Sequence, residues 1–328
     1  MQAILCTEYG SHDELILSDV PDPIPGPGQV LIDVHAASLN FPDLLVIRGE
    51  YQFRPEPPFV PGAEAAGVIA ALGEGVTAFF VGQRVTSFGV AGAFAEQRVA
   101  DVAMVIPIPD EIAFATAAAM TMSYGTAYHA LVQRGQLRSD ETLLVLGAAG
   151  GVGSTAVEIG KVLGATVIAA ASSDEKLAFC DSIGADHTIN YTTEDLRSRV
   201  KELTDGHGVD VIYDPVGGDL AEPAFRSIAW GGRYLVIGFA AGEVPAIPLN
   251  LPLLKVASIV GVFLGSFTQE QPQVAAANIE EISRMIVAGD LNPPITETFP
   301  LERVIDAFEL MASRRAMGKV VLQVLDGR

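Results

Sequence analysis

The sequence contains few cysteines and lacks any long apolar segment. Its two cysteines, Cys6 and Cys180, both lie in apolar runs of the 328-residue chain. We therefore expect buried thiols instead of the disulfide framework that staples small secreted domains. No apolar segment reaches the roughly 20 residues that cross a bilayer, and the N-terminal residues lack the basic and apolar regions of a signal peptide. We expect a cytoplasmic protein that does not bind membranes.

Basic residues are also scarce, because 20 lysines and arginines stand against 40 aspartates and glutamates, for a formal charge of −20. Such a surface repels nucleic-acid phosphates, so we expect no nucleic-acid partner, and any anionic ligand needs a local binding site. The histidines and cysteines form no HxxxH, CxxC or HExxH spacing that would bring two metal ligands onto one face. The sequence therefore predicts no metal site.

The chain is too long for one ordinary domain, and its texture changes near residue 115. The first part alternates short β-rich runs with Pro and Gly turns, which is typical of a β domain. Later segments alternate strands and helices, which predicts a parallel α/β domain. We expect a Rossmann-type domain of residues 123–265 inserted into a domain of residues 1–122 and 266–328, whose last strand returns to the first domain. The expected strands of the inserted domain are 142–146, 166–170, 209–214 and 233–238, with a helix at 153–163. Beyond residue 265 we expect two more helices, one around 279–286 and one at 301–312.

A glycine-rich loop is the strongest local motif. Gly147, Gly150 and Gly153 follow an apolar strand and open an amphipathic helix, with Gly151 and Val152 between them. Small residues are needed where a strand turns directly into a helix and where the backbone approaches a pyrophosphate. Helix N-terminal amides then supply the positive field that the acidic surface lacks. The alternative is three glycines that only pack a tight turn.

The choice of nucleotide is read at the end of the second strand. That strand leads into Ser172, Ser173, Asp174 and, after one residue, Lys176. Hydroxyls and a lysine suit a 2′-phosphate, which favours NADPH. Asp174 is the objection, because a carboxylate that accepts bonds from the ribose hydroxyls would favour NADH. We expect Asp174 to cap the following helix instead.

Four segments together resemble a known family: residues 38–43, 61–68, 147–153 and 318–321. In this order and spacing they make the chain similar to the medium-chain dehydrogenases/reductases, specifically the zinc-free quinone oxidoreductase (zeta-crystallin-like) branch. The resemblance covers essentially the whole chain. It implies a GroES-like β-rich catalytic domain and a Rossmann doubly wound parallel-sheet nucleotide-binding domain.

The positions that bind zinc in other members of that superfamily hold different residues here. Asn40 stands where the resemblance places a ligand cysteine, and Ala63 stands where it places a ligand histidine. The four-cysteine structural zinc lobe is absent as well. An amide or a methyl group cannot replace the thiolate or imidazole donors of a zinc site. This departure agrees with the quinone oxidoreductase branch and with a protein that binds no metal.

The resemblance also implies a set of cofactor residues. It places Tyr191, in an Ile-Asn-Tyr segment, beside the adenosine phosphate, so that Ser172, Lys176 and Tyr191 resemble the family's 2′-phosphate site for NADPH. Arg315 could serve in place of its neighbour Arg314. Further residues that resemble the lining of the nicotinamide and phosphate groove are Thr126, Gly238, Phe239, Ala240, Ala241, Phe263, Leu264, Gly265 and Arg314.

Three residues are candidates for the chemistry. Without a Lewis acid, the acceptor itself should spread the incoming negative charge, as a quinone or another conjugated carbonyl does, so that hydrogen-bond donors suffice. The Asn40 amide and the Tyr51 hydroxyl are candidate donors, and Asp43 would orient the cofactor or the entrance. Alternatively, Asn40 and Asp43 cap a helix, and Tyr51 is a partly buried surface tyrosine.

We therefore expect an NADPH-dependent quinone oxidoreductase that acts on a small-molecule quinone. An alternative is an NADPH-dependent double-bond reductase of enone, enoyl or haloacrylate type, and a third interpretation is a nucleotide-binding, crystallin-like structural protein. The segment 257–264 is apolar and β-branched, which indicates an edge strand of the Rossmann sheet. An unpaired edge invites pairing with a second copy, so we expect a homodimer. The alternative is an internal strand covered by helices.

Overall fold

The computed structural model describes residues 1–325, and their contacts divide the chain into two compact units. Unit 1 comprises residues 1–122, 279–288 and those from 295 onward, and unit 2 comprises residues 123–278 and 289–294. We expected one domain of residues 1–122 with 266–328 and another of residues 123–265. The observed units differ from these domains after residue 265, and residues 326–328 lie outside the described part of the chain. Residues 266–278 group with unit 2 because Phe267 stacks on His129 at 3.7 Å and Gln133 donates to Asn278.

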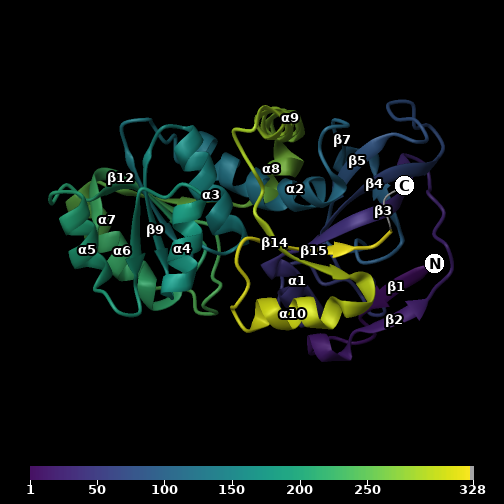
Figure 1. Ribbon diagram of the computed structural model, residues 1–328, viewed down its shortest axis with the longest axis horizontal. Coiled ribbons are helices and arrows are strands. Elements are labelled where there is room, and N and C mark those ends of the chain that lie inside the picture. The colour runs from purple at the N-terminus through teal and green to yellow at the C-terminus, as the bar shows by residue number, and fades with distance from the viewer. Residues whose placement is uncertain (326–328) are drawn as a thin grey trace. The chain divides into compact units, whose positions relative to one another are not determined.

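Unit 1 contains a seven-stranded sheet in which the last strand of the chain lies among the first. The order is β14-β15-β3-β4-β5-β7, and β6 also pairs with β3. Figure 1 shows the yellow C-terminal strand β15 beside the purple strand β3, with helix α10 near β14. The strands of this sheet are β3 (Gln29–Leu39), β4 (Glu64–Leu72), β5 (Arg84–Phe88), β6 (Gln97–Asp101), β7 (Val105–Pro107), β14 (Ile295–Pro300) and β15 (Lys319–Gln323). Two further strands, β1 (Gln2–Leu5) and β2 (Ile16–Asp19), pair with each other in a separate antiparallel sheet.

Apolar side chains from both ends of the chain form the main core of unit 1. Helix α1 (Phe41–Ile47) buries Leu44 and Ile47, and helix α10 (Val304–Ala312) buries Phe308 in the same cluster as Leu39 and Leu322. Burial of each such side chain contributes about 1.5–3 kcal/mol. The return of the chain to its first domain is therefore held by packing as well as by strand pairing.

Unit 2 contains a six-stranded parallel sheet of order β10-β9-β8-β11-β12-β13. The residues of β8 from Leu143 to Leu146 are all fully buried, as expected for a parallel strand covered on both faces. Figure 1 shows α3 and α4 on one side of these strands and α5 and α6 on the other. The strands are β8 (Thr142–Leu146), β9 (Thr166–Ala171), β10 (His187–Asn190), β11 (Val209–Asp214), β12 (Ile228–Val236) and β13 (Ser258–Gly261).

The helices of unit 2 connect these strands, and two further helices lie at its junctions with unit 1. Helix α2 runs from unit 1 into unit 2 between Met122 and Ser123, and a π-helical segment, His129–Arg134, follows it. The helices are α2 (Phe114–Tyr128), α3 (Gly151–Val162), α4 (Asp174–Ser182), α5 (Leu196–Leu203), α6 (Ala221–Arg226), α7 (Asn250–Lys255), α8 (Leu264–Glu270) and α9 (Pro272–Ala288).

The strand order reverses between β8 and β11, since β9 and β10 lie on one side of β8 and β11 to β13 on the other. In open α/β sheets, ligands bind outside the carboxyl ends of the strands at such a switch point. The expected α/β fold with a Rossmann-type parallel sheet is confirmed, and the geometry already indicates where a ligand would bind.

Some elements differ from the expectation. Strand β12 begins at Ile228 and ends at Val236, so Gly238 lies in the loop beyond it and not in the strand. Strands β10 and β14 were not expected, because β10 is a short run of mixed polarity and β14 is largely exposed, without apolar alternation. Among residues 1–325, no helix is long and apolar enough to cross a membrane.

Candidate functional site

The glycine loop of unit 2 forms a tight turn from β8 into α3. Gly147 has φ +56°, in the left-handed region that favours glycine, and Gly150 occupies the N-cap position of α3. A Cβ atom on Gly153 would lie 2.2 Å from the carbonyl oxygen of Gly147, so no side chain fits there without a backbone shift. The loop therefore requires glycine for close packing, and the N-terminal amides of α3, including those of Gly151 and Val152, can bind an anion.

The loop after β11 contacts this glycine loop at the switch point. A Cβ atom on Gly147 would lie 2.8 Å from Cγ2 of Val216. The buried carboxylate of Asp214 accepts hydrogen bonds from the backbone N–H groups of Val216 at 2.7 Å and Gly217 at 2.8 Å, and from the hydroxyl of Tyr234. Burial raises the pKa of Asp214, and these bonds hold the loop in place.

Most of the expected cofactor residues lie at the same edge of the sheet, because parallel strands share one carboxyl edge. Ser172, Ser173 and Lys176 follow β9, and Tyr191 follows β10. The residues 238–241 follow β12, and their backbone is bound to the loop after β11, since Ala240 N–H donates to Pro215 and Ala241 N–H to Val216. Phe263 follows β13, and Leu264 and Gly265 open α8.

Two expected cofactor residues lie elsewhere. Thr126 is half-buried on α2 of unit 2 and does not follow a strand. Arg314 belongs to unit 1, in the turn after α10, where it has φ +58°. Arg315 donates through Nε to Ser313 at 3.0 Å. Unit 2 by itself therefore contains the expected cofactor residues between Gly147 and Gly265, whereas Arg314 lies in unit 1.

The tip of β9 presents hydroxyl and ammonium groups side by side. The Lys176 Nζ donates to Ser172 Oγ at 3.3 Å. Ser173 is the N-cap residue of α4, and its Oγ accepts from the Lys176 backbone N–H at 3.4 Å. The expectation that Asp174 caps this helix is wrong, because Asp174 is already the first helical residue. Its carboxylate instead accepts a hydrogen bond of 2.8 Å from the side-chain amide of Asn190.

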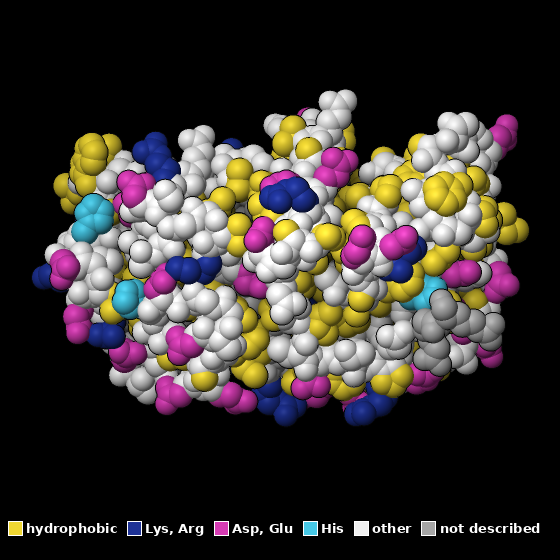
Figure 2. Space-filling view, turned by 45° about the horizontal axis from the view of Figure 1, so that its top comes forward, with side chains coloured by type: hydrophobic (Ala, Val, Ile, Leu, Met, Phe, Trp, Pro, Cys, Tyr) yellow, Lys and Arg dark blue, Asp and Glu magenta, His cyan; other side chains and the backbone are white. Residues whose placement is uncertain are grey.

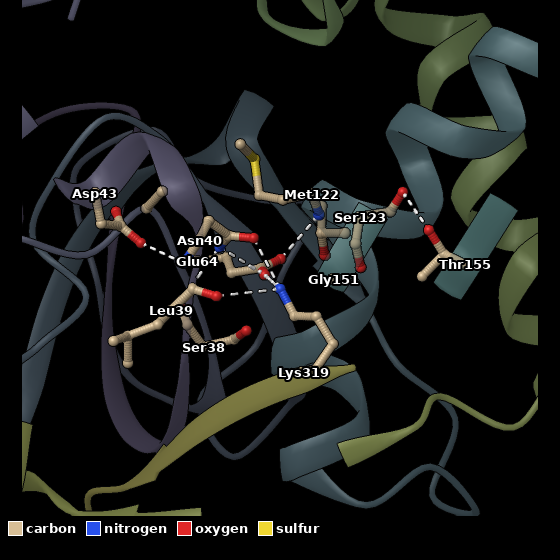
Figure 3. A network of polar contacts seen from close by, with 12 residues as sticks. Ser38, Leu39, Asn40, Asp43, Glu64, Met122, Ser123, Gly151, Thr155 and Lys319 are labelled. Atoms are coloured by element: carbon tan, nitrogen blue, oxygen red, sulfur yellow. Dashed lines mark hydrogen bonds and ion pairs between the residues drawn. The ribbon is translucent and has the colours of Figure 1, made fainter. Parts of the chain in front are cut away.

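In unit 1, three strand ends bring distant polar residues into one buried cluster. Asn40 follows β3, Glu64 begins β4 and Lys319 begins β15, and the register pairs Ser38 with Glu64 and Leu39 with Val320. Figure 3 shows the three side chains pointing toward one another. We call Asn40, Glu64 and Lys319 the unit 1 polar cluster.

The polar cluster satisfies its own hydrogen bonds. Lys319 Nζ donates to Asn40 Oδ1 at 2.7 Å and forms an ion pair with Glu64 Oε1 at 3.0 Å. Asn40 Nδ2 donates to Glu64 Oε1 at 2.9 Å and to the carbonyl of Ser38 at 3.3 Å. Both amide hydrogens of Asn40 thus have protein acceptors, so a ligand oxygen would have to displace one of them. The other Glu64 oxygen accepts from the Met122 backbone N–H at 2.8 Å (Figure 3).

Asp43 and Tyr51 lie next to this cluster in unit 1. Asp43 is buried and accepts a 2.7 Å bond from the backbone N–H of Asn40, so it caps α1 as the alternative interpretation held. Asn40 occupies the N-cap position of α1, and its side chain also bonds to Glu64 and Lys319. Burial raises the pKa of Asp43 to about 7. Burial, and then the negative charge of Asp43, raise the pKa of Tyr51, which keeps its hydroxyl protonated.

Glu64 and Lys319 are site residues that the sequence reasoning did not single out. Both lie in segments that carried the family resemblance, 61–68 and 318–321, and both are charged residues at the start of apolar strands. A charge in such a run is uncommon because burial of an unpaired ion is costly. That anomaly was the available signal, and it pointed to a buried pair.

Charged side chains on the surface are mixed. Figure 2 shows dark blue basic groups dispersed among magenta acidic groups on the face in view. An anionic cofactor would therefore depend on local groups such as the α3 amides and Lys176. Within the described chain, no three His, Cys, Asp or Glu side chains are grouped so that they could hold a metal ion.

Two family models match the chain, one for each type of domain. Residues 26–110 match the alcohol dehydrogenase GroES-like domain, and residues 151–281 match the zinc-binding dehydrogenase model. The description of the second model mentions zinc, but the two positions where the resemblance places zinc ligands, Asn40 and Ala63, lie in the range of the first model and hold side chains that do not bind zinc. These matches agree with the expected pair of a GroES-like and a Rossmann domain.

Relatives extend the similarity over nearly the whole chain. A quinone oxidoreductase-like protein 2 homolog of Nematostella vectensis is 39% identical over 98% of this chain and 88% of its own length. A quinone oxidoreductase structure of Pseudomonas syringae is 34% identical, with a TM-score of 0.92 over 98% of this chain and 99% of that one. A quinone oxidoreductase of Escherichia coli complexed with NADPH is 27% identical, with a TM-score of 0.93 over 98% and 100%. The chain belongs to the quinone oxidoreductase family of the medium-chain dehydrogenase/reductase superfamily.

Proposed function

We propose that the chain is an NADPH-dependent quinone oxidoreductase, which transfers hydride from the nicotinamide to a quinone. The observation that carries this proposal is the glycine loop at the switch point of the parallel sheet, in a chain similar over its whole length to quinone oxidoreductases. One of the similar structures is an NADPH complex, which supports the choice of cofactor.

The residues of unit 2 suit each part of NADPH. The amides at the start of α3 would bind the pyrophosphate, since Gly147 and Gly153 let the backbone approach closely. Ser172, Lys176 and Tyr191 would bind the 2′-phosphate, with the Lys176 ammonium already beside the Ser172 hydroxyl. The residues 238–241 and 263–265, with Thr126, would line the nicotinamide side.

Unit 1 would supply the polar groups that meet the acceptor. NADPH supplies the hydride, and a quinone spreads the incoming charge over its own conjugated oxygens. The hydroxyl of Tyr51, whose pKa burial raises, would donate a hydrogen bond to the developing oxyanion. Asn40, held by Glu64 and Lys319, would donate only if the quinone oxygen replaced the weaker acceptor, the Ser38 carbonyl at 3.3 Å.

Oxidation of NADPH, followed at 340 nm with EDTA present, tests the proposal. We expect turnover with a benzoquinone or a phenanthrenequinone and slow turnover with NADH. Lys176→Ala should raise the KM for NADPH about 10- to 100-fold, the value of a charge-assisted bond, and leave the KM for NADH unchanged. The matched control is Lys201→Ala, at an exposed lysine of α5.

Three results would contradict the proposal. Preference for an aliphatic enone would indicate double-bond reduction. Equal use of NADH and NADPH would remove the 2′-phosphate site. Binding of NADPH without turnover of any acceptor would favour a nucleotide-binding structural protein.

We also propose a cytoplasmic homodimer that joins two copies of β13. This strand pairs only with β12 and so lies at the edge of the described sheet, and its Ile259 is 43% exposed. Leu253, Leu254 and Val256, just before it, are exposed as well. Together they offer an apolar edge that suits pairing with a second copy.

Light scattering tests the dimer. The wild-type chain should be a dimer and Ile259→Glu should be a monomer, whereas Ile24→Glu, at an exposed isoleucine of unit 1, should remain a dimer. A wild-type monomer at micromolar concentration would contradict the dimer.

A further inference from the structure

Asn190 connects the ends of two neighbouring strands at the carboxyl edge of unit 2. It is the last residue of β10, pairs in register with Ala171 of β9 and is only 6% exposed. Its side-chain Nδ2 donates a 2.8 Å hydrogen bond to Oδ1 of Asp174. A buried side chain thus holds an exposed carboxylate at the position where nucleotide choice is read.

The orientation of the Asn190 amide is determined by its other partners. Its Oδ1 accepts a 3.1 Å bond from the backbone N–H of Thr192 and a 2.6 Å bond from the Thr192 hydroxyl. A backbone N–H only donates, so the oxygen must face Thr192 and the NH₂ group must face Asp174. The Asn190 backbone N–H in turn donates to Glu194 at 2.8 Å, which holds the residue in place.

A carboxylate just after β9, where Asp174 lies, has two effects on nucleotide binding. When it is free, it accepts bonds from the ribose hydroxyls of NADH, and it repels the 2′-phosphate of NADPH. Here the amide of Asn190 occupies Oδ1 of Asp174, while Lys176, in the first turn of α4, donates to Ser172, which precedes the N-cap residue of that helix. This segment therefore presents Ser172 and Lys176, which suit a phosphate, and holds in place the Asp174 carboxylate, which would repel a phosphate.

We propose that Asn190 determines the preference of this chain for the 2′-phosphorylated nucleotide, by holding the Asp174 carboxylate away from the ribose. The inference rests on the proposed NADPH site but adds a buried residue that acts through a neighbouring side chain. Asn190 is a positioning residue, and the proposed effect on nucleotide preference passes through Asp174.

Calorimetric binding of NADPH, NADH, 2′,5′-adenosine diphosphate and 5′-adenosine monophosphate to the full chain tests this without any quinone. Asn190→Ala should lower the ratio of the NADH Kd to the NADPH Kd at least about tenfold, because a released carboxylate gains charge-assisted bonds to the ribose. The second variant, Asn190→Ala with Asp174→Asn, should lose the gain in NADH affinity. The matched control is Asn278→Ala, at another asparagine that is 6% exposed and that bonds to Gln133.

Two results would overturn the inference. An equal loss of affinity for both nucleotides in Asn190→Ala would mean that the residue only stabilises the strand ends. Asp174→Asn alone, in which Asn190 is intact, should leave the NADH Kd within about threefold, less than the loss of one charge-assisted bond. A larger loss would show that Asp174 already binds the ribose. Failure of the proposed function is distinguishable, because a wild-type chain without preference for 2′,5′-adenosine diphosphate over the monophosphate would contradict the phosphate site itself.

Discussion

Replacement of Lys319 by methionine removes the only ammonium of the unit 1 polar cluster and keeps most of the buried aliphatic stem. Glu64 is then left fully buried, with the amide of Asn40 and the backbone N–H of Met122 as its donors. Its charge loses the partner that stands 3.0 Å away in the wild type. Removal of one partner of such a pair costs about 3–5 kcal/mol, because the remaining ion stays buried without compensation.

The double variant Lys319→Met with Glu64→Gln separates this charge effect from the loss of packing. A neutral glutamine still accepts from Met122 N–H and no longer needs a cation. We expect the double variant to cost about 1–2 kcal/mol, the value of the hydrogen bonds that are lost, and thus to be more stable than Lys319→Met alone. Lys201→Met, at an exposed position of α5, is the control and should change stability by less than about 0.5 kcal/mol.

Urea unfolding measures these differences. Circular dichroism follows the unfolding of the whole chain, and the loss in Lys319→Met should appear as an earlier transition. If Lys319→Met costs less than about 1 kcal/mol, or if the double variant costs the sum of the two single variants, the buried pair does not stabilise unit 1 as argued.

Two further outcomes follow from burial and from backbone geometry. Burial raises the pKa of Glu158 from 4.5 to about 7 and that of Asp43 from 3.8 to about 7, so the folded chain holds these protons more tightly than the unfolded chain. The free energy of unfolding should therefore fall as pH rises from about 4 to about 7. Glu158→Gln should remove on the order of 3 kcal/mol of that fall, as measured by urea unfolding at several pH values. The same dependence of stability on pH in this variant would contradict the raised pKa of Glu158. Gly153→Ala should abolish measurable NADPH binding in calorimetry, because its Cβ would lie 2.2 Å from the carbonyl oxygen of Gly147. The control Gly261→Ala should bind normally, because no atom lies within 4 Å of its Cβ. Wild-type affinity of Gly153→Ala would show that the loop tolerates a backbone shift.

The glycine loop shows how far local sequence carries a prediction. An apolar strand, three spaced glycines and an amphipathic helix all lie within about twenty consecutive residues, and each constrains its neighbours directly. The expected strands at 142–146 and 209–214 are confirmed with the same bounds. The family resemblance, which rested on four segments in order, is confirmed by relatives that cover 98% of the chain.

Side-chain partners were less accessible to that reasoning. The expected cap at Asp174 was wrong because residue types at a helix start do not reveal which of two adjacent residues leaves the strand conformation. Ser173 does so, and the Asp174 carboxylate then faces the neighbouring strand, where Asn190 binds it. The distance of 16 residues between Asp174 and Asn190 gave no indication of this contact.

The sequence by itself determined the glycine turn from strand to helix, strands such as 142–146 and 209–214, and the family, because these depend on periodicity and on glycine positions that neighbouring residues impose. Only the tertiary structure decided that Asn40, Glu64 and Lys319 share one buried cluster. Asn40 and Lys319 are separated by 279 positions, and their 2.7 Å contact exists because β15 pairs with β3 in one register. Such a register is set by packing across the whole sheet, which no local pattern encodes.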